Sequence, residues 1–292
     1  MSASSSTARR VGGDLVVGTS GWTYPPWRDH FYPRGLPHQR ELAHLATRLP
    51  AVEVNGTFYS LTRPSVCDQW RGMVPPDFHF AIKGSRYVTH MLKLAHCEAP
   101  LANFFASGIL RLGAQLGPIL WQLPPMVRFD AARAEAFFAQ LPRDVPAAER
   151  LARRHDARVT GRACLTAPDG RNRKLRYALE VRHESWLTPE ALRLIRRHDL
   201  ALVIADTAGK HPFAMHDTAD FTYVRLHGAS ELYRSRYSDA EIWLWARRVR
   251  SWLADRRDVY VFFDNTDKRH APGDALRLLQ AVEGNARHRR AA

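Results

Sequence analysis

The sequence has few cysteines, no long apolar run and comparatively little negative charge. Its three cysteines, Cys67, Cys97 and Cys164, lie far apart and show none of the paired spacings of a zinc site or a redox motif. No apolar run approaches the roughly 18 residues of a membrane span, and the Ser-rich segment 1–13 has no apolar core resembling a signal peptide. We therefore expect inert thiols, no membrane partner and a cytoplasmic protein.

The scarcity of acidic residues leaves the chain strongly basic. It contains 43 Lys and Arg against 29 Asp and Glu, which gives a formal net charge of +14 and a pI near 10.3. Such a charge favours anionic partners, either nucleic acid or a phosphorylated small molecule. Ordinary solvated surfaces explain it equally well, because Arg far outnumbers Lys. The charge is concentrated in residues 142–176, where ten Lys or Arg face four Asp or Glu.

Eight short runs of β-branched and aromatic residues recur along the chain, with helical or loop segments between them. Strands that alternate with helices predict an α/β fold with parallel strands, and the count of eight predicts a closed (β/α)8 TIM-like barrel. The runs are Leu15–Ser20, Ala51–Asn55, Phe78–Lys83, Pro118–Leu123, Tyr177–Arg182, Ala201–Asp206, Phe221–His227 and Val259–Asp264.

Helical periodicity fills most of the gaps between these runs. A single barrel domain is expected at 15–283, with a basic insertion at 142–175 before strand five, a disordered tail at 1–14 and a basic tail at 284–292. Residues 207–220 have little helical pattern and are expected to form a loop. The expected helices are Gln39–Leu49, Ser65–Val74, Leu101–Leu116, Ala131–Leu141 capped by Asp130, Ala147–His155, a helix from Thr188 to about His198, Ser238–Trp252 with a capping box, and Pro272–Val282.

Polar residues stand at the C-terminal ends of nearly all the predicted strands. In a TIM barrel these ends meet at one mouth, which is where active sites lie. A satisfied ion-pair network that plugs the barrel top is the alternative interpretation. The strand-end residues are Glu53, Asn55, Lys83, Gln122, Glu180, Arg182, Asp206, Arg225, His227 and Asp264, with Asn265 just beyond. Tyr59 and Trp186 follow polar strand ends directly and are expected to contact a ligand.

Several stretches together resemble one family. They are Gly18-Thr19-Ser20-Gly21-Trp22, Val52-Glu53-Val54-Asn55-Gly56-Thr57-Phe58-Tyr59, Phe80-Ala81-Ile82-Lys83, Glu180-Val181-Arg182-His183-Glu184-Ser185-Trp186, Tyr223-Val224-Arg225-Leu226-His227-Gly228 and Phe262-Phe263-Asp264-Asn265. The chain resembles the YecE-like family, catalogued as domain-of-unknown-function family 72. The resemblance implies a TIM-like barrel and brings no reaction with it. Asp264 stands where many members have Asn, which adds a carboxylate to the mouth.

The family fold is similar to barrels of the endonuclease IV and xylose isomerase kind, which hold divalent metals. A metal, if present, is expected at Glu180, Asp206, His227 and Asp264, because His and carboxylates are suitable ligands. Lys83, Arg182 and Arg225 come from the same rim and oppose a metal cluster. We therefore predict no cofactor and favour an anionic substrate, which Arg binds in a bidentate way.

The sequence thus favours an enzyme, a hydrolase or lyase, that acts on a phosphate-bearing or other anionic substrate at the barrel mouth. Lys83, Arg182 and Arg225 are expected to bind the anion, and Glu53 or Glu180 to act as general acid or base, with Asp206 and Asp264 as further catalytic carboxylates. Asn55, Tyr59, Gln122, Trp186, His227 and Asn265 are predicted to complete the binding site. Hydrolysis of a glycosidic bond stays open. The alternatives are a nucleic-acid-binding or nuclease-like barrel related in fold to endonuclease IV, and a non-catalytic scaffold barrel.

Overall fold

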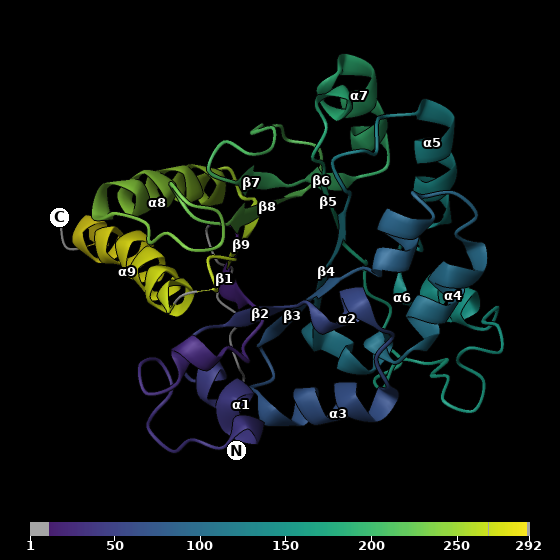
Figure 1. The fold of residues 1–292 in the computed structure, drawn as a ribbon, viewed down its shortest axis with the longest axis horizontal. Helices are drawn as coiled ribbons and strands as arrows, with labels where there is room; N and C mark the ends of the chain where they lie inside the picture. Colours follow the sequence, from purple (N-terminus) through teal and green to yellow (C-terminus); the bar gives the residue numbers. More distant parts are fainter. Residues whose placement is uncertain (1–11, 268, 291–292) are drawn as a thin grey trace, which may run out of the picture.

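The computed structural model describes residues 12–267 and 269–290, and in these residues nine parallel strands form a single sheet that curves into a nearly closed barrel (Figure 1). The order around the sheet is β6-β5-β4-β3-β2-β1-β9-β8-β7. This confirms the predicted α/β barrel. The strands are β1 (Leu15–Ser20), β2 (Ala51–Val54), β3 (His79–Lys83), β4 (Leu116–Gln122), β5 (Tyr177–Glu180), β6 (Leu200–Leu202), β7 (Ile204–Asp206), β8 (Phe221–Leu226) and β9 (Asp258–Phe263).

The ninth strand arises because the predicted strand Ala201–Asp206 is interrupted. Its first part, β6, pairs with β5, whereas its second part, β7, pairs with β8. Val203 lies between the two parts, and its N–H donates to the carbonyl of Leu179 over 3.0 Å. The two parts occupy opposite ends of the sheet order, so one short run of chain bridges the place where the barrel is incompletely closed.

Small side chains on one side of the barrel interior face large ones on the other. Alanines from β2, β3, β5 and β6 lie opposite aromatic side chains from β8 and β9, and the whole set is buried. Gly18 of β1 belongs to the same arrangement, because a Cβ there would lie 3.1 Å from the ring of Phe262. The interior is therefore packed like other protein cores. The set includes Ala51, Ala81, Ala178, Ala201, Phe221, Tyr223, Tyr260 and Phe262.

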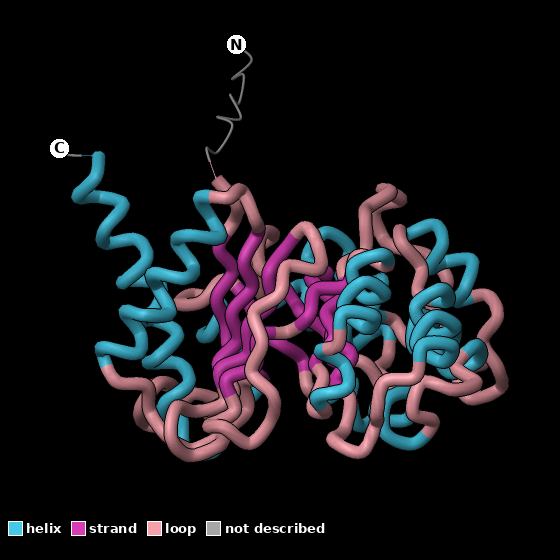
Figure 2. Tube along the Cα trace, turned by 90° about the horizontal axis from the view of Figure 1, so that it is seen from above, coloured by secondary structure: helices cyan, strands magenta, loops and turns pink. Residues whose placement is uncertain are grey.

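Helices surround the strands and leave loops at both ends of the barrel (Figure 2). The predicted caps are confirmed: Asp130 and Thr188 each accept a hydrogen bond from the backbone three residues on, and Ser238 forms a capping box with Glu241. The α-helices are α1 (Glu41–Ala46), α2 (Gly56–Tyr59), α3 (Pro64–Met73), α4 (Glu98–Ala106), α5 (Ala131–Gln140), α6 (Val145–Ala152), α7 (Pro189–Arg197), α8 (Asp239–Ala254) and α9 (His270–Arg290).

Two predicted helical boundaries were wrong. The expected helix Leu101–Leu116 breaks after α4, because Gly108 has a φ of 114° and a short 3-10 helix, Ile109–Gln115, follows it. The last helix continues to Arg290, so residues 284–290 extend α9 instead of forming a separate tail. Residues 1–11 and 291–292 of the predicted tails lie outside the described residues. None of the described helices is both long and apolar enough to cross a membrane.

The basic segment and the loop before β8 agree with expectation in outline. Residues 142–175 contain α6 and then an irregular stretch that returns through an antiparallel bridge between Asp144 and Lys174. Residues 207–220 contain neither helix nor strand. Three cations of the basic segment, and Arg176 directly after it, pair with nearby carboxylates: Arg158 with Asp156, Arg173 with Asp169, Lys174 with Asp199 and Asp220, and Arg176 with Asp258.

Candidate active site at the barrel mouth

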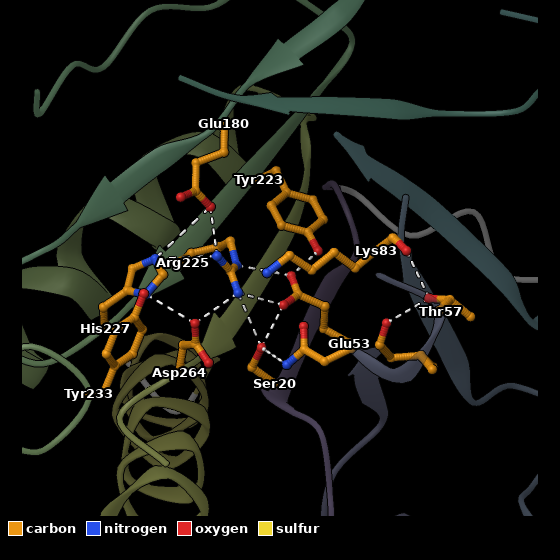
Figure 3. A network of polar contacts seen from close by, with 12 residues as sticks. Ser20, Glu53, Thr57, Lys83, Glu180, Tyr223, Arg225, His227, Tyr233 and Asp264 are labelled. Carbon is orange, nitrogen blue, oxygen red and sulfur yellow. Dashed lines mark hydrogen bonds and ion pairs between the residues drawn. The ribbon is translucent and has the colours of Figure 1, made fainter. Parts of the chain in front are cut away.

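Strand alternation brings four charged residues together inside the barrel at its C-terminal end. Glu53, Glu180, Arg225 and Asp264 follow Ala51, Ala178, Tyr223 and Phe262 by two residues, and those four belong to the interior cluster. All four charged residues are buried. Figure 3 shows them converging on the guanidinium of Arg225. We call this group the carboxylate ring.

Arg225 is the centre of the carboxylate ring. Its Nη2 donates to Glu53 Oε1 over 2.7 Å and to Asp264 Oδ2 over 2.8 Å. Its Nη1 donates to Glu180 Oε2 over 2.6 Å, and its Nε to Glu53 Oε2 over 3.1 Å. Because every guanidinium nitrogen already has a protein acceptor, Arg225 fits a positioning role better than the predicted direct contact with substrate.

Two carboxylates of the ring, those of Glu180 and Asp264, are held in their ionised forms. Burial alone would raise the pKa of Glu180, but Arg225 and Arg182 outweigh it and hold the pKa well below its usual range. Burial also opposes ionisation of Asp264, yet Arg225 and His227 lower its pKa to about 2. A carboxylate with so low a pKa takes up a proton poorly at neutral pH. This environment argues against Glu180 as the general acid or base.

Glu53 is the most completely hydrogen-bonded member of the ring. Besides the two bonds from Arg225, its carboxylate accepts from Ser20 Oγ over 2.5 Å and from Tyr223 Oη over 2.6 Å. Asn55, which directly follows β2, donates through Nδ2 to the same Ser20 hydroxyl over 2.9 Å. These bonds fix the Glu53 carboxylate as part of the buried framework.

Arg182 and His227 contact two carboxylates of the ring. Arg182 Nε donates to Glu180 Oε1 over 3.0 Å, and its Nη2 lies 3.5 Å from the hydroxyl of Tyr233. His227 is buried, with Nδ1 3.0 Å from Asp264 Oδ2. The Arg182 side chain keeps some exposure, at 13%. Of the two guanidinium groups at the ring, that of Arg182 is therefore the one that a ligand in the mouth can reach.

Lys83 differs from the other cations at the mouth. Its carbonyl accepts from Thr57 Oγ1 over 2.7 Å, and its side chain extends towards Arg225 and Glu53 (Figure 3). The Nζ atom lies 4.4 Å from the centroid of the Phe58 ring. Within the described part of the chain, this amine forms no ion pair with any carboxylate. Burial, and after it the charge of Arg225, lowers the pKa of Lys83 to about 8.

Two histidines belong to the cationic surroundings of the mouth. Burial, followed by the charges of Lys83 and Arg182, lowers the pKa of His90. Burial and then Arg182 lower the pKa of His211. Both imidazoles are thus neutral hydrogen-bonding groups, His90 near Lys83 and Arg182, and His211 near Arg182. Gln122 and Tyr59 complete the predicted set here: Gln122 lies beside Glu180 in the sheet register, and Tyr59 is 70% exposed at the end of α2.

Three predicted site residues do not join the ring, and strand or loop geometry explains each. Ala205 faces the interior, so Asp206 points the other way and accepts from Tyr237 Oη over 3.1 Å. Asn265 has opposite parity to Asp264, and its Nδ2 donates to Ser235 O and to Asp274.

Trp186 is buried, not at the mouth as expected. Its Nε1 donates to the carbonyl of Val127 over 2.9 Å, and its ring packs against Phe129 and Phe138. It stabilises the packing of α5 and its preceding loop against the short helical turn that contains it.

The residues expected to hold a metal are not arranged as a ligand set. In residues 12–267 and 269–290, no group of three or more His, Cys, Asp or Glu side chains has the geometry to hold a metal ion. The guanidinium of Arg225 lies between Glu180 and Asp264, and Asp206 is directed towards Tyr237. A cation of the protein thus occupies the position between these two carboxylates.

Several residues of the site were missed by sequence reasoning. Ser20 and Tyr223 lie on interior-facing positions of two predicted strands, so parity alone could have found them. His90 lies in a short π-helix, Tyr87–Met91, and His211 and Tyr233 come from irregular segments, so none of the three carries a periodic signal.

The family described as "Protein of unknown function DUF72" matches residues 16–292. The chain belongs to this family. A DUF72 family protein from Thermotoga maritima has a similar crystal structure, with a TM-score of 0.73, 24% identity, and coverage of 92% of this chain and 99% of that one. A second, from Enterococcus faecalis, gives a TM-score of 0.69 at 18% identity, covering 92% of this chain and 95% of that one.

Curated relatives carry the names expected for DUF72. UPF0759 protein YecE of Escherichia coli (strain K12) is 29% identical over 110 residues, and the aligned part spans only 38% of this chain and 38% of YecE. UPF0759 protein YunF of Bacillus subtilis (strain 168) is 20% identical over 302 residues, covering 92% of this chain and 95% of YunF. The resemblance to the YecE-like family is thereby confirmed.

Proposed function

We propose that the protein is an enzyme that binds a small anionic substrate, carrying a phosphate or a carboxylate, at the C-terminal mouth of the barrel. The observation that supports this best is the contrast between the cations there. Arg225 is committed to three carboxylates, whereas the Lys83 side chain extends towards the same ring (Figure 3) and its amine forms no ion pair with a described residue.

A bound anion would relieve the unfavourable environment of Lys83. Its ammonium is partly desolvated, and the charge of Arg225 disfavours it further. An anion beside Nζ would stabilise the charged form, as an opposite charge does for any buried ammonium. Arg182 lies across the mouth and can contribute a planar donor pair, which suits carboxylate and phosphate oxygens. The neutral side chains of His90 and His211 supply further hydrogen bonds.

The proton transfers of such an enzyme are better assigned to Lys83 than to Glu180. Glu180 and Asp264 keep pKa values well below neutrality, so they serve to hold Arg182, Arg225 and His227 in place. Lys83 has a pKa near the pH of the cell, where a proton-transferring group is most effective.

Thermal melting and calorimetry with inorganic phosphate, pyruvate and dihydroxyacetone phosphate test this proposal. A ligand at 100 times its Kd is expected to stabilise the fold by about 2.7 kcal/mol. The Lys83→Met and Arg182→Met variants should lose the effect. The Lys174→Met variant should keep the stabilisation by anions. This substitution also removes one positive charge, but Lys174 pairs with Asp199 and Asp220, directly before β6 and β8, and is not one of the mouth residues. Stability that ignores all three anions would favour a scaffold barrel instead.

Nucleic-acid binding is the second candidate, and one surface favours it. A cavity of about 300 Å³ beside the mouth is lined by Tyr59, Tyr87 and Arg158 among others, and both tyrosines are exposed. Exposed aromatic rings beside a cation can stack on bases. Retardation of single-stranded DNA or RNA at low salt, weakened by Tyr59→Ala and falling steeply as salt rises, would support this function. Absence of retardation at low salt would refute it.

A further inference from the structure

We infer that Lys83 is a nucleophilic amine that forms a Schiff base with the carbonyl group of an anionic aldehyde or ketone. The inference rests on the proposed function for the location of the substrate, and it adds the substrate class and the covalent step. Lys83 carries a primary amine, whereas the other charged groups described at the mouth are carboxylates and guanidinium groups.

The position of Lys83 suits a nucleophile. The residue ends strand β3, where Thr57 donates to its carbonyl and Gly84 N–H donates to the carbonyl of Leu120 over 2.8 Å. The side chain therefore starts from a rigid strand end and not from a loop. The Nζ atom lies 4.4 Å from the centroid of the Phe58 ring, and the side chain extends towards Arg225 and Glu53 (Figure 3). Reactive groups on rigid elements are held in a productive geometry more closely than groups on loops.

Burial and the charge of Arg225 leave the amine partly neutral at physiological pH. Burial is the main cause of its lowered pKa, followed by Arg225, whereas Asp264, Glu53 and Glu180 oppose the shift. With a pKa of about 8 in place of 10.5, the neutral fraction at pH 7 is roughly 300-fold larger than for an ordinary lysine. Desolvation and a neighbouring cation are a recognised way to activate a lysine for imine formation.

The carboxylates of the ring oppose the lowering of the Lys83 pKa but do not pair with its amine. Glu53, Glu180 and Asp264 are each bonded to Arg225, and none of them forms an ion pair with Lys83 in the described residues. They lie close enough to stabilise a positive iminium once it forms. The amine can thus act as a nucleophile, and its product finds negative charge nearby.

The covalent step balances without an oxidant or a reductant. The lone pair of neutral Nζ forms a bond to the carbonyl carbon, and the C=O π bond breaks to give a carbinolamine. The oxygen then leaves as water with one proton from nitrogen and one from solvent, and the nitrogen keeps one proton as the iminium. Arg182 would hold the phosphate or carboxylate of the same substrate molecule, so that the carbonyl carbon meets Nζ.

Reductive trapping tests the inference with the whole protein. Pyruvate and dihydroxyacetone phosphate are incubated with it separately at pH 7.5 in the presence of sodium cyanoborohydride, and the modified lysine is identified by peptide mass mapping. We expect an adduct at Lys83 at least tenfold above that at the exposed Lys93, Lys174 and Lys210 of the same molecules. The two compounds show whether a carboxylate or a phosphate accompanies the carbonyl group.

Variants separate this inference from the proposed function. Lys83→Arg keeps the positive charge, so it should retain anion-dependent stabilisation and lose the adduct, whereas Lys174→Met should retain both. Anion binding without a preferred adduct at Lys83 would overturn the Schiff-base step and leave the proposed function standing. An adduct at Lys83 without any stabilisation by anions would support the nucleophilic role of the Lys83 amine and refute the anion site. Failure of both measurements would overturn both.

Discussion

Replacement of Arg225 by Met removes the cation that three buried carboxylates share. Glu53, Glu180 and Asp264 each lie within 2.8 Å of a guanidinium nitrogen, and Met has a similar length without charge or donors. Breaking a buried ion pair by removal of one partner costs about 3–5 kcal/mol, because an uncompensated charge stays buried. Since three partners are affected, we expect a loss of unfolding free energy of about 5 kcal/mol at pH 7.

The pH dependence of this variant should have the opposite sign to that of the parent protein. In the parent, the folded-state pKa of Asp264, about 2, lies below its unfolded value. Its contribution of about 2 kcal/mol is present above the unfolded pKa and is lost as the pH falls through the folded pKa. In Arg225→Met, burial is no longer opposed by Arg225, so the folded-state pKa values of Glu180 and Asp264 should rise. The variant should then gain stability as the pH falls from 7 to 4.

Urea unfolding followed by tryptophan fluorescence at pH 7, 5.5 and 4.5 measures both effects. Arg234→Met is the matched control, because it removes an arginine from an exposed pair with Glu231 and should cost less than about 1 kcal/mol. A cost below about 1 kcal/mol for Arg225→Met at pH 7 would refute the central role of Arg225. So would a stability difference from the parent that widens as the pH falls.

Two further predictions concern the helices that frame the barrel. Gly108→Ala should destabilise the fold by more than about 1 kcal/mol, because φ is 114° and the new Cβ would lie 2.6 Å from the backbone of Pro64. Gly72→Ala is the control: a Cβ there has open space in α3, so this variant should gain about 0.5–1 kcal/mol of stability. Equal effects in thermal melting would contradict the assigned conformation. Ser238→Ala removes the capping box with Glu241 and should cost about 1 kcal/mol in urea unfolding, and no measurable loss would show that the cap is dispensable.

The fold and the inward face of the barrel could be predicted largely from local patterns. Alternation along Tyr177–Arg182 placed Glu180 on the same face as Ala178, and the structure keeps that face in the interior. Cap residues such as Thr188 and Ser238 bond to backbone groups only three residues away, so the starts of their helices could be predicted from the sequence. Side chains in a strand point to alternate faces, so the residues on the interior face can be predicted wherever a strand is uninterrupted.

The roles within the mouth depend on contacts that no local pattern encodes. The three carboxylates bound to Arg225 come from positions 172, 45 and 39 residues away along the chain. The sequence therefore indicated a charged rim. It did not indicate that Arg225 would be surrounded by carboxylates, or that the Lys83 amine would form no ion pair with any described residue. Asp206 was expected among the mouth carboxylates because it is polar and ends a strand, whereas the interior-facing Ala205 places its side chain on the other side, towards Tyr237.

The pKa of Lys83, measured with and without an anion, tests the central claim most directly. Selective ¹³C labelling of the lysine side chains makes the titration tractable, because the chain has few lysines and Lys83→Arg assigns the signal. We predict a pKa of about 8 without ligand, and a rise towards the usual lysine value when phosphate or pyruvate binds. An ordinary pKa near 10.5 that neither anion changes would contradict both the desolvated amine and the anion site at the barrel mouth.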